Sequence, residues 1–317
     1  MNLQLTGLHH VTAITGDAPA NLDFYTRVLG MRLVKKTVNQ DDTSAYHLFY
    51  ADRAGAPGTD LTFFDWAHSP RNIAGTGTIA RTALRVHGHA ALDWWTARLS
   101  AHGIAHSGIV ERGGWTAVFF SDPEGQALAL VDDKGVAGGQ PWEHSSVPVE
   151  MGIRGLHAVT LQVRDLAPTA LVLTEVLGFR QVHGYRTEQG HPVAVFVTAD
   201  GGAGTEVHVE YGKHLTSGQA GRGGVHHIAF RVPDFAEHEG WLLRLREFRI
   251  PSSQVIDRFY FRSIYFREPG GILYELATDG PGFATDEAPD QLGTRLALPP
   301  FLEPQRASIE AGLRPLA

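Results

Sequence analysis

One sequence pattern occurs several times along the chain, and this repetition limits the available folds more than any other feature. The segment GLHHVTAITGD…VLGMR at residues 7–32 recurs as GLHAVTLQVRD…VLGFR at residues 155–180, with a constant offset of 148 residues. A weaker match relates SDPEGQALAL at residues 121–130 to REPGGILYEL at residues 267–276, with an offset of 146 residues. Such repeats indicate that the same supersecondary unit is used repeatedly.

Each copy joins a strand pattern to a helix pattern. Its first segment alternates as a strand does, an amphipathic helix follows, and further strands end in a hairpin. In the first copy Asp17 is a candidate helix N-cap and Gly30 a candidate terminator, and the third copy repeats this from Asp165 to Gly178. We therefore expect an α+β fold of four βαβββ units, at about residues 5–66, 77–133, 153–212 and 222–279.

The units divide the chain into four stretches. Residues 1–133 carry the first two units and residues 153–279 carry the last two. Residues 134–152 are rich in Gly, Ser and Pro, which predicts a linker. From residue 280 to residue 317 the pattern stops, and we expect a C-terminal tail that lies over the body.

Composition excludes several classes of function. The 317 residues carry a net charge of -7 and no basic run, so we expect no nucleic-acid partner. We find neither a signal peptide nor an apolar stretch of about 18 residues, so we expect a cytoplasmic protein without a membrane partner. The sequence leaves the oligomeric state open, a homo-oligomer included. Because cysteine is absent and 17 histidines are present, any metal must be bound by imidazole and carboxylate groups.

The repeated units resemble the vicinal oxygen chelate superfamily, in which paired βαβββ units form half-open barrels around a metal ion. The resemblance extends to about Asp279. In that superfamily the first strand of a unit supplies a histidine that directly precedes Val or Ile, and the last strand supplies another ligand. The resemblance therefore implies His10, His227 and Glu275 as metal ligands. Strand alternation is consistent with this choice and predicts that His9 and His226 point to the opposite faces.

The repeat provides an internal control for this assignment. The offsets relate each implied ligand to a position in another unit, and none of these positions holds a histidine or a carboxylate. Ala158 corresponds to His10, Arg81 to His227 and Ala129 to Glu275. When Pro57 is aligned with Pro269, Phe63 takes the place of Glu275 in the first unit. The sequence thus predicts one metal site, formed by the first and fourth units, which would have to build one barrel together while the second and third build the other.

Two histidines and one carboxylate form the facial triad typical of non-haem Fe(II) oxygenases, which leaves positions open for substrate and O₂. The stretch DRFYFRSIYFREPGGILYELATD at residues 257–279 resembles the hydroquinone-type ring-cleaving dioxygenases, as does LHHVT at residues 8–12. The resemblance implies an Fe(II) enzyme that opens a small hydroquinone-type or catecholic ring with O₂. It also implies further active-site residues, which are Tyr265, Arg258, His226, Thr12 and His9.

Several alternatives remain at this stage. A glyoxalase-like lyase or isomerase would use Zn(II), Ni(II) or Mn(II) and a second carboxylate, against which Phe63 argues. A non-catalytic protein of the same fold would bind an aromatic ligand without an intact triad. Tyr265 lies in an aromatic run where core packing is common, and Arg258 is close enough in sequence to pair with Asp257.

Overall fold

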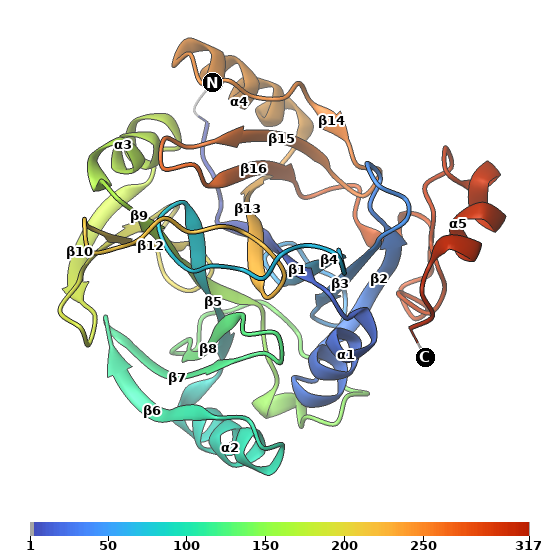
Figure 1. Ribbon diagram of the computed structural model, residues 1–317, viewed down its shortest axis with the longest axis horizontal. Helices are drawn as coiled ribbons and strands as arrows, with labels where there is room; N and C mark the ends of the chain where they lie inside the picture. The colour runs from blue at the N-terminus through green and yellow to red at the C-terminus, as the bar shows by residue number, and fades with distance from the viewer. Residues whose placement is uncertain (1–2, 317) are drawn as a thin grey trace.

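The computed structural model describes residues 3–316 and contains two curled eight-stranded sheets (Figure 1). The first sheet has the strand order β14-β15-β16-β13-β1-β4-β3-β2. Its strands are β1 (Leu8–Thr15), β2 (Arg32–Val38), β3 (Tyr46–Ala51), β4 (Asp60–Asp65), β13 (Gly224–Val232), β14 (Ile256–Asp257), β15 (Arg262–Arg267) and β16 (Leu273–Thr278). This sheet therefore combines strands of the first and the fourth repeat unit.

The second sheet combines the other two units in the order β10-β11-β12-β9-β5-β8-β7-β6. Its strands are β5 (Thr78–Val86), β6 (His106–Arg112), β7 (Trp115–Ser121), β8 (Ala127–Asp132), β9 (Leu156–Val163), β10 (Arg180–Arg186), β11 (Pro192–Val197) and β12 (Glu206–Tyr211). The predicted α+β fold of two half-open barrels is thus confirmed.

The same pairing rule organises both sheets. The first strand of a unit lies antiparallel to the first strand of the other unit, as in the β1–β13 and β5–β9 pairs. It also lies parallel to the last strand of its own unit, as in the β1–β4 and β13–β16 pairs. Each sheet therefore has two first strands at its centre, flanked by two last strands.

Helices connect the first and second strands of each unit. They are α1 (Ala18–Asp23), α2 (Gly88–Ala101), α3 (Leu166–Leu171) and α4 (Phe235–Glu247), and α1 and α3 each continue into a π-helical turn, η1 (Phe24–Val28) and η3 (Val172–Val176). The predicted caps are confirmed, because the carboxylates of Asp17 and Asp165 accept backbone N–H groups of the following turn. Gly30 and Gly178 follow these helices with φ angles of 69° and 73°, which favour glycine.

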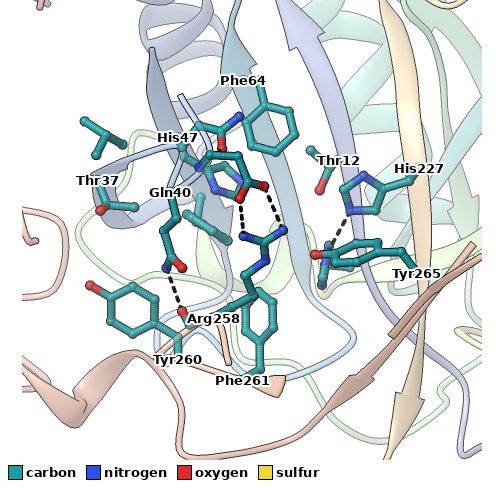
Figure 2. A pocket seen from close by; sticks show the side chains of 15 residues that line it. Thr12, Thr37, Gln40, His47, Phe64, His227, Arg258, Tyr260, Phe261 and Tyr265 are labelled. Carbon is teal, nitrogen blue, oxygen red and sulfur yellow. Dashed lines mark hydrogen bonds and ion pairs between the residues drawn. The ribbon is translucent and has the colours of Figure 1, made fainter. Parts of the chain in front are cut away.

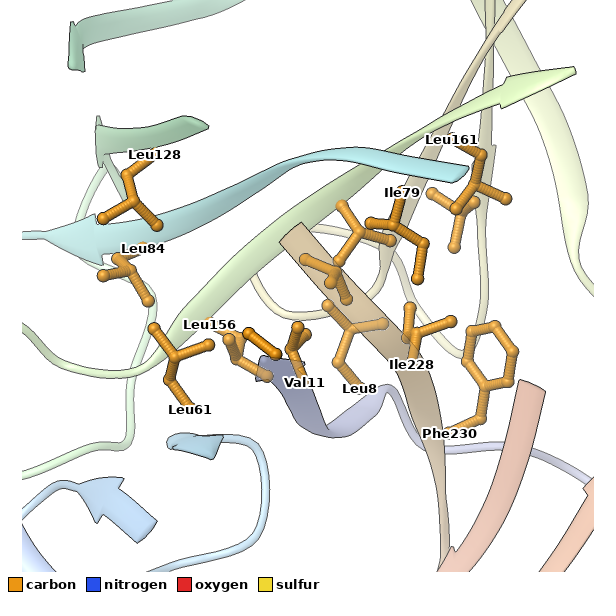
Figure 3. Packing of buried hydrophobic residues seen from close by; sticks show 14 of the residues in the cluster. Leu8, Val11, Leu61, Ile79, Leu84, Leu128, Leu156, Leu161, Ile228 and Phe230 are labelled. Atoms are coloured by element: carbon orange, nitrogen blue, oxygen red, sulfur yellow. The ribbon is translucent and has the colours of Figure 1, made fainter. Parts of the chain in front are cut away.

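The main hydrophobic core lies between the two sheets (Figure 3). Leucine, isoleucine and valine side chains from both sheets meet there. The residues of this contact include Leu8, Val11, Leu61 and Ile228 of the first sheet and Ile79, Leu84, Leu128, Leu156 and Leu161 of the second. Because strand side chains alternate, the other face of each sheet lines the inside of its own barrel.

The segment after residue 279 packs against the first barrel. It contains η4 (Phe283–Thr285), η5 (Glu303–Gln305) and α5 (Arg306–Gly312). Phe283 and Leu292 join a buried cluster with Val34, Phe49 and Tyr260 of the first sheet's units. Residues 134–152 hold one short turn, η2 (Val149–Met151). Among residues 3–316, no helix combines the length and the apolar character needed to cross a bilayer.

Candidate metal and substrate site

Three ligand-type side chains meet inside the first barrel. His10 comes from β1, His227 from the adjacent β13, and Glu275 from β16 on the other side of β13. The Nε2 atoms of His10 and His227 lie 3.1 and 2.8 Å from Glu275 Oε2 and 3.4 Å from each other. All three side chains are buried. The first and fourth units therefore bring together the residues that the resemblance implied as ligands.

The carboxylate of Glu275 is oriented by a neighbouring serine. Ser263 Oγ on β15 donates to Glu275 Oε1 at 2.5 Å. Glu275 Oε2, which faces the two imidazoles, has no hydrogen-bond donor among the described residues although it is fully buried. A buried carboxylate oxygen without a donor is costly unless a cation satisfies it.

The geometry of the three atoms fits a divalent metal ion. Imidazole nitrogen and carboxylate oxygen bind such ions at about 2.0–2.2 Å, so adjacent ligand atoms lie about 3 Å apart. The observed separations of 2.8–3.4 Å agree with that spacing. The three side chains supply one nitrogen or oxygen each, and the cavity in front of them leaves room for further ligands.

His9 does not point away from the site, and the prediction from strand alternation is wrong. The β1–β13 pairing shifts register between Leu8 and His10 and again between Thr12 and Ala13, so that His9 and His226 are the extra residues of two β-bulges. A bulge redirects side chains next to a site. As a result, Nδ1 of His9 lies 2.9 Å from Nδ1 of His10, and Nδ1 of His226 lies 2.8 Å from Nδ1 of His227.

The hydrogen bonds of His9 fix the proton positions on His10. His9 Nε2 lies 3.1 Å from the carbonyl oxygen of Thr278, which only accepts, so this nitrogen carries the proton. Burial, with a smaller contribution from His10, lowers the pKa of His9 to about 3 and keeps its ring neutral. His9 Nδ1 is then an acceptor for His10 Nδ1–H. The remaining nitrogen of a neutral His10, Nε2, therefore presents a lone pair, as a metal ligand requires.

Protonation states at the other two residues also suit a cation. Burial lowers the pKa of His227, which favours the neutral imidazole. The hydrogen bond that Ser263 donates to Oε1 favours the ionised form of Glu275. Two neutral imidazoles and an ionised carboxylate are the forms in which these groups bind a metal.

A cavity opens in front of the three residues (Figure 2). The empty space in this cavity and at its mouth is about 460 Å³, which includes open solvent. Aromatic side chains form much of its wall, and they are His47, Phe49, Phe64, Tyr260, Phe261 and Tyr265. Thr12 lies beside His227 in this cavity and accepts a hydrogen bond of 2.8 Å from Thr62. The wall suits a planar apolar ring.

Arg258 and Tyr265 stand together at the cavity. The guanidinium of Arg258 pairs with both carboxylate oxygens of Asp41 at 2.8 and 3.1 Å, and not with Asp257. It also lies 5.4 Å from the centre of the Tyr265 ring. Tyr265 packs edge-on to His227, and burial raises the pKa of its hydroxyl above the usual value. Its phenol therefore stays protonated at neutral pH.

A second cavity adjoins the first through shared walls. Arg258, Tyr265 and His227 line both cavities, and His226 and Trp66 line the second one. Burial lowers the pKa of His226 to about 3, so its ring is neutral. The structure thus places all five further residues implied by the resemblance within or directly behind the site.

Sequence reasoning missed three side chains that shape the site. Ser263 holds Glu275, Asp41 holds Arg258, and His47 lines the cavity. A signal existed for Ser263 alone, because it stands two residues before Tyr265 on one strand and shares its face. Asp41 and His47 belong to a different unit from Arg258, and only the folded sheet brings them near.

Strand register corrects the comparison between units. Glu275 lies opposite Ala229, two residues after His227, and the equivalent partner of Thr12 in the first unit is Thr62, not Phe63. Phe63 points instead into the core between the sheets. A second carboxylate is therefore absent from this position, as expected, but the residue in its place is a threonine.

The second barrel keeps one ligand-type residue at the matching positions, which the sequence offsets did not reveal. Thr160 pairs with His208, so His208 is the third unit's counterpart of Glu275. Both of its ring nitrogens are occupied, by the Tyr185 hydroxyl at 3.1 Å and by Glu206 at 3.0 Å. The second barrel therefore does not repeat the arrangement of His10, His227 and Glu275.

One other group of ligand-type residues lies within metal-binding distance in the described chain, namely His191, Glu210 and His214. Its two histidines are about one-third exposed. The carboxylate of Glu210 already accepts from Gln162 at 2.8 Å and contacts His191 at 3.0 Å. Because its oxygens have partners, this group lacks the unsatisfied oxygen that marks Glu275.

Comparison with known proteins agrees with this geometry. Residues 7–130 and 155–276 match the model of the glyoxalase/bleomycin resistance protein/dioxygenase superfamily. The chain belongs to this superfamily. The two matched segments coincide with the two halves of the repeat.

Relatives with high coverage share this assignment. The candidate ring-cleaving dioxygenase MhqA of Bacillus subtilis strain 168 is 45% identical over 99% of this chain and 100% of its own. The chlorohydroquinone/hydroquinone 1,2-dioxygenase of Sphingobium indicum is 30% identical over 95% of this chain and 93% of its own.

Solved structures extend the comparison to the fold. A crystal structure of a candidate dioxygenase from Bacillus subtilis superposes with a TM-score of 0.89 at 37% identity, covering 98% of this chain and 97% of that one. Glyoxalase I from Zea mays superposes with a TM-score of 0.63 at 17% identity, covering 86% of this chain and 92% of that one. At that identity the maize enzyme supports the fold alone.

Proposed function

We propose that this protein is an Fe(II)-dependent dioxygenase that opens the ring of a hydroquinone-type aromatic compound with O₂. The observation that carries the proposal is the buried set of two imidazoles and one carboxylate at the end of an aromatic-lined cavity. The names of the two relatives, a ring-cleaving and a hydroquinone dioxygenase, agree with it. Thr62 at the place of a second carboxylate speaks against a site with four protein ligands, as glyoxalase-type lyases have.

His10, His227 and Glu275 would hold the iron. Bound there, Fe(II) would supply coordination positions for a deprotonated ring hydroxyl and for O₂, and a path for electrons from the ring to O₂. His9 would keep the lone pair of His10 available to the ion, and Ser263 would keep Oε2 of Glu275 available to it.

The cavity residues would bind and orient the ring. The aromatic wall would pack against the ring and exclude water from it. Tyr265, protonated at neutral pH, is placed to donate a hydrogen bond or a proton to a substrate oxygen near His227. Arg258, fixed by Asp41, provides a positive charge for negative charge that develops on oxygen.

Oxygen consumption tests the proposal. Protein loaded with Fe(II) without air should take up one O₂ per hydroquinone, and the product should gain the mass of one O₂ molecule. Catechol in place of hydroquinone tests the ring type. Metal binding without any O₂ uptake would contradict a dioxygenase and favour a lyase or isomerase.

Variants connect the activity to the proposed ligands. Glu275→Gln and His227→Ala should lose bound iron and O₂ uptake together. His191→Ala, in the histidine and glutamate group of the second barrel, is the matched control and should keep both. Iron retained by His227→Ala but lost by His191→Ala would place the ion at the wrong site for this mechanism.

A further inference from the structure

One residue of the cavity wall carries a buried hydroxyl without a partner. Thr37 on β2 lines the cavity and is 2% exposed. Its Oγ1 makes no hydrogen bond within residues 3–316. Burying a hydroxyl without a partner costs about 1–3 kcal/mol, so such a group in a cavity wall marks a place where a ligand would complete the hydrogen bond.

His47 lies directly beside Thr37 on the neighbouring strand. The two residues are paired across β2 and β3, so their side chains share the inner face of the barrel. The His47 ring packs between Phe49 and Phe64, with ring centres 4.0 and 4.4 Å away. This packing holds the imidazole in one orientation at the cavity wall.

A chain of hydroxyls determines what His47 offers to a ligand. Thr62 donates its proton to Thr12 at 2.8 Å and therefore accepts from His47 Nε2 at 3.0 Å. Burial lowers the pKa of His47 well below its usual value, so the ring is neutral. With the proton on Nε2, Nδ1 is left as an acceptor for a group in the cavity.

Thr37 and the proposed metal ligands occupy different parts of the cavity. β2 is the edge strand of the sheet and lies three strands from β1, which carries His10. Adjacent strands are about 4.8 Å apart, so β1 and β2 are separated by about three strand spacings along the curled sheet. Figure 2 places Thr37 and His227 at opposite sides of the view of the pocket.

We propose that Thr37 and His47 form a subsite for the second hydroxyl of a 1,4-dihydroxylated ring, an inference that rests on the proposed function. The first hydroxyl would lie at His10, His227 and Glu275. The second would accept a hydrogen bond from Thr37 Oγ1 and donate one to His47 Nδ1. In hydroquinone the two hydroxyls point in opposite directions along one ring axis, whereas in catechol they are adjacent. The subsite therefore selects hydroquinones over catechols and simple phenols.

The subsite is tested by removing the Thr37 hydroxyl from the protein and, separately, the second hydroxyl from the ligand, with phenol in place of hydroquinone. Thr37→Val keeps the shape of the side chain without the hydroxyl, and Thr37→Ser keeps a hydroxyl. Binding of hydroquinone and of phenol is measured by calorimetry on the Fe(II)-loaded protein without oxygen. We expect Thr37→Val to weaken hydroquinone binding about 5- to 10-fold. Phenol binding should change by less than about twofold, and Thr37→Ser should behave as the wild type does.

Thermal unfolding separates ligand recognition from a structural role. Thr37→Val removes an unpaired buried hydroxyl and should not lower the melting temperature of the ligand-free protein. A lower melting temperature, equal loss of hydroquinone and phenol binding, or no loss of either would overturn the subsite. A wild type that does not bind hydroquinone more tightly than phenol would overturn it as well.

These measurements are independent of turnover. Selective hydroquinone binding that depends on Thr37, without O₂ uptake, would keep the subsite and refute the dioxygenase. O₂ uptake with hydroquinone that is unaffected by Thr37→Val would keep the dioxygenase and refute the subsite.

Discussion

At the scale of single residues, the site depends on side chains that contact the proposed metal ligands and orient them. His9 and His226 each contact the neighbouring histidine through Nδ1, but their other nitrogens differ. Nε2 of His9 is held by the carbonyl of Thr278, whereas His226 lines the second cavity. His9 is therefore a positioning residue for His10.

We expect His9→Phe to weaken metal binding about 10- to 100-fold, because His10 loses the partner that fixes its proton. A chelating dye in competition measures the affinity directly, without turnover. His157, the repeat counterpart of His9, is buried next to Ala158 and offers a matched control. Equal loss of affinity in His157→Phe would show that the effect is general destabilisation.

Tyr265→Phe removes one hydroxyl and keeps the ring that packs on His227. We expect iron content to stay at the wild-type level while kcat for O₂ uptake falls about 100-fold or more, since proton donation near the substrate is lost. Metal analysis and steady-state kinetics on the same samples check this. An unchanged kcat would assign Tyr265 to packing alone.

At the scale of elements, the C-terminal segment supports the cavity wall. Lys35 on β2 is fully buried, and its ammonium pairs with Asp286 at 2.7 Å and with Glu287. Asp286 also accepts a hydrogen bond of 2.9 Å from the hydroxyl of Tyr260, which lines the cavity. The segment after residue 279 is thus tied to the barrel by buried charge.

We expect Lys35→Met to destabilise the protein by about 3–5 kcal/mol, because Glu287 loses its buried cation and, among residues 3–316, keeps only the exposed Arg295 at 3.9 Å. The double variant Lys35→Met/Glu287→Leu should recover much of this loss. Urea unfolding of both variants measures the difference. A double variant as unstable as the single one would argue that packing around Lys35, and not its charge, holds the segment.

Elements were predictable where local chemistry decides them. The helices after Asp17 and Asp165 begin and end at the expected residues, since a carboxylate cap and a glycine act within one turn. The bulges at His9 and His226 carry no such local signal, because they arise from pairing between β1 and β13. The position of Thr62 opposite Thr12 also depends on strand register, which the proline alignment misplaced by one residue.

At the scale of the whole molecule, each barrel is built from units that are distant in sequence. The sequence predicted this arrangement because the proposed metal ligands occur only in the first and fourth units, which must therefore lie in one barrel. The role of Thr37 and His47 was not accessible in the same way, because no motif contains them. Their relation to the site exists only when the sheet curls and brings its edge strand toward the cavity.

The two lobes also meet through carboxylates on the turn between β7 and β8. Glu124 accepts from Thr15 Oγ1 at 2.5 Å and from the backbone N–H of Gly16 at 2.9 Å. Asp122 accepts from the hydroxyl of Tyr25 at 3.1 Å. These contacts connect the second unit to the first helix of the first unit, across the boundary between the sheets.

The Asp122 contact should make the stability of the whole molecule depend on pH. Burial raises the pKa of Asp122 from 3.8 to about 6 in the folded protein. Below about pH 3 the carboxyl is protonated in both states and costs nothing. As the pH rises from there to about 6, the unfolded chain ionises it more readily than the folded protein does. Folding therefore loses about 3 kcal/mol from this group across that window and regains none above it.

Asp122→Asn removes the titration, so the wild type should lose about 3 kcal/mol relative to the variant between pH 3 and pH 7. Urea unfolding of both proteins across this range measures the difference and cancels the other titrating groups. The exposed Asp93→Asn is the control and should run parallel to the wild type. If the difference in unfolding free energy between the wild type and Asp122→Asn stays constant with pH, Asp122 is ionised in the folded protein throughout. Its charge would then be stabilised by the hydrogen bonds that it accepts from the Tyr25 hydroxyl and from the backbone N–H groups of Glu124 and Gln126.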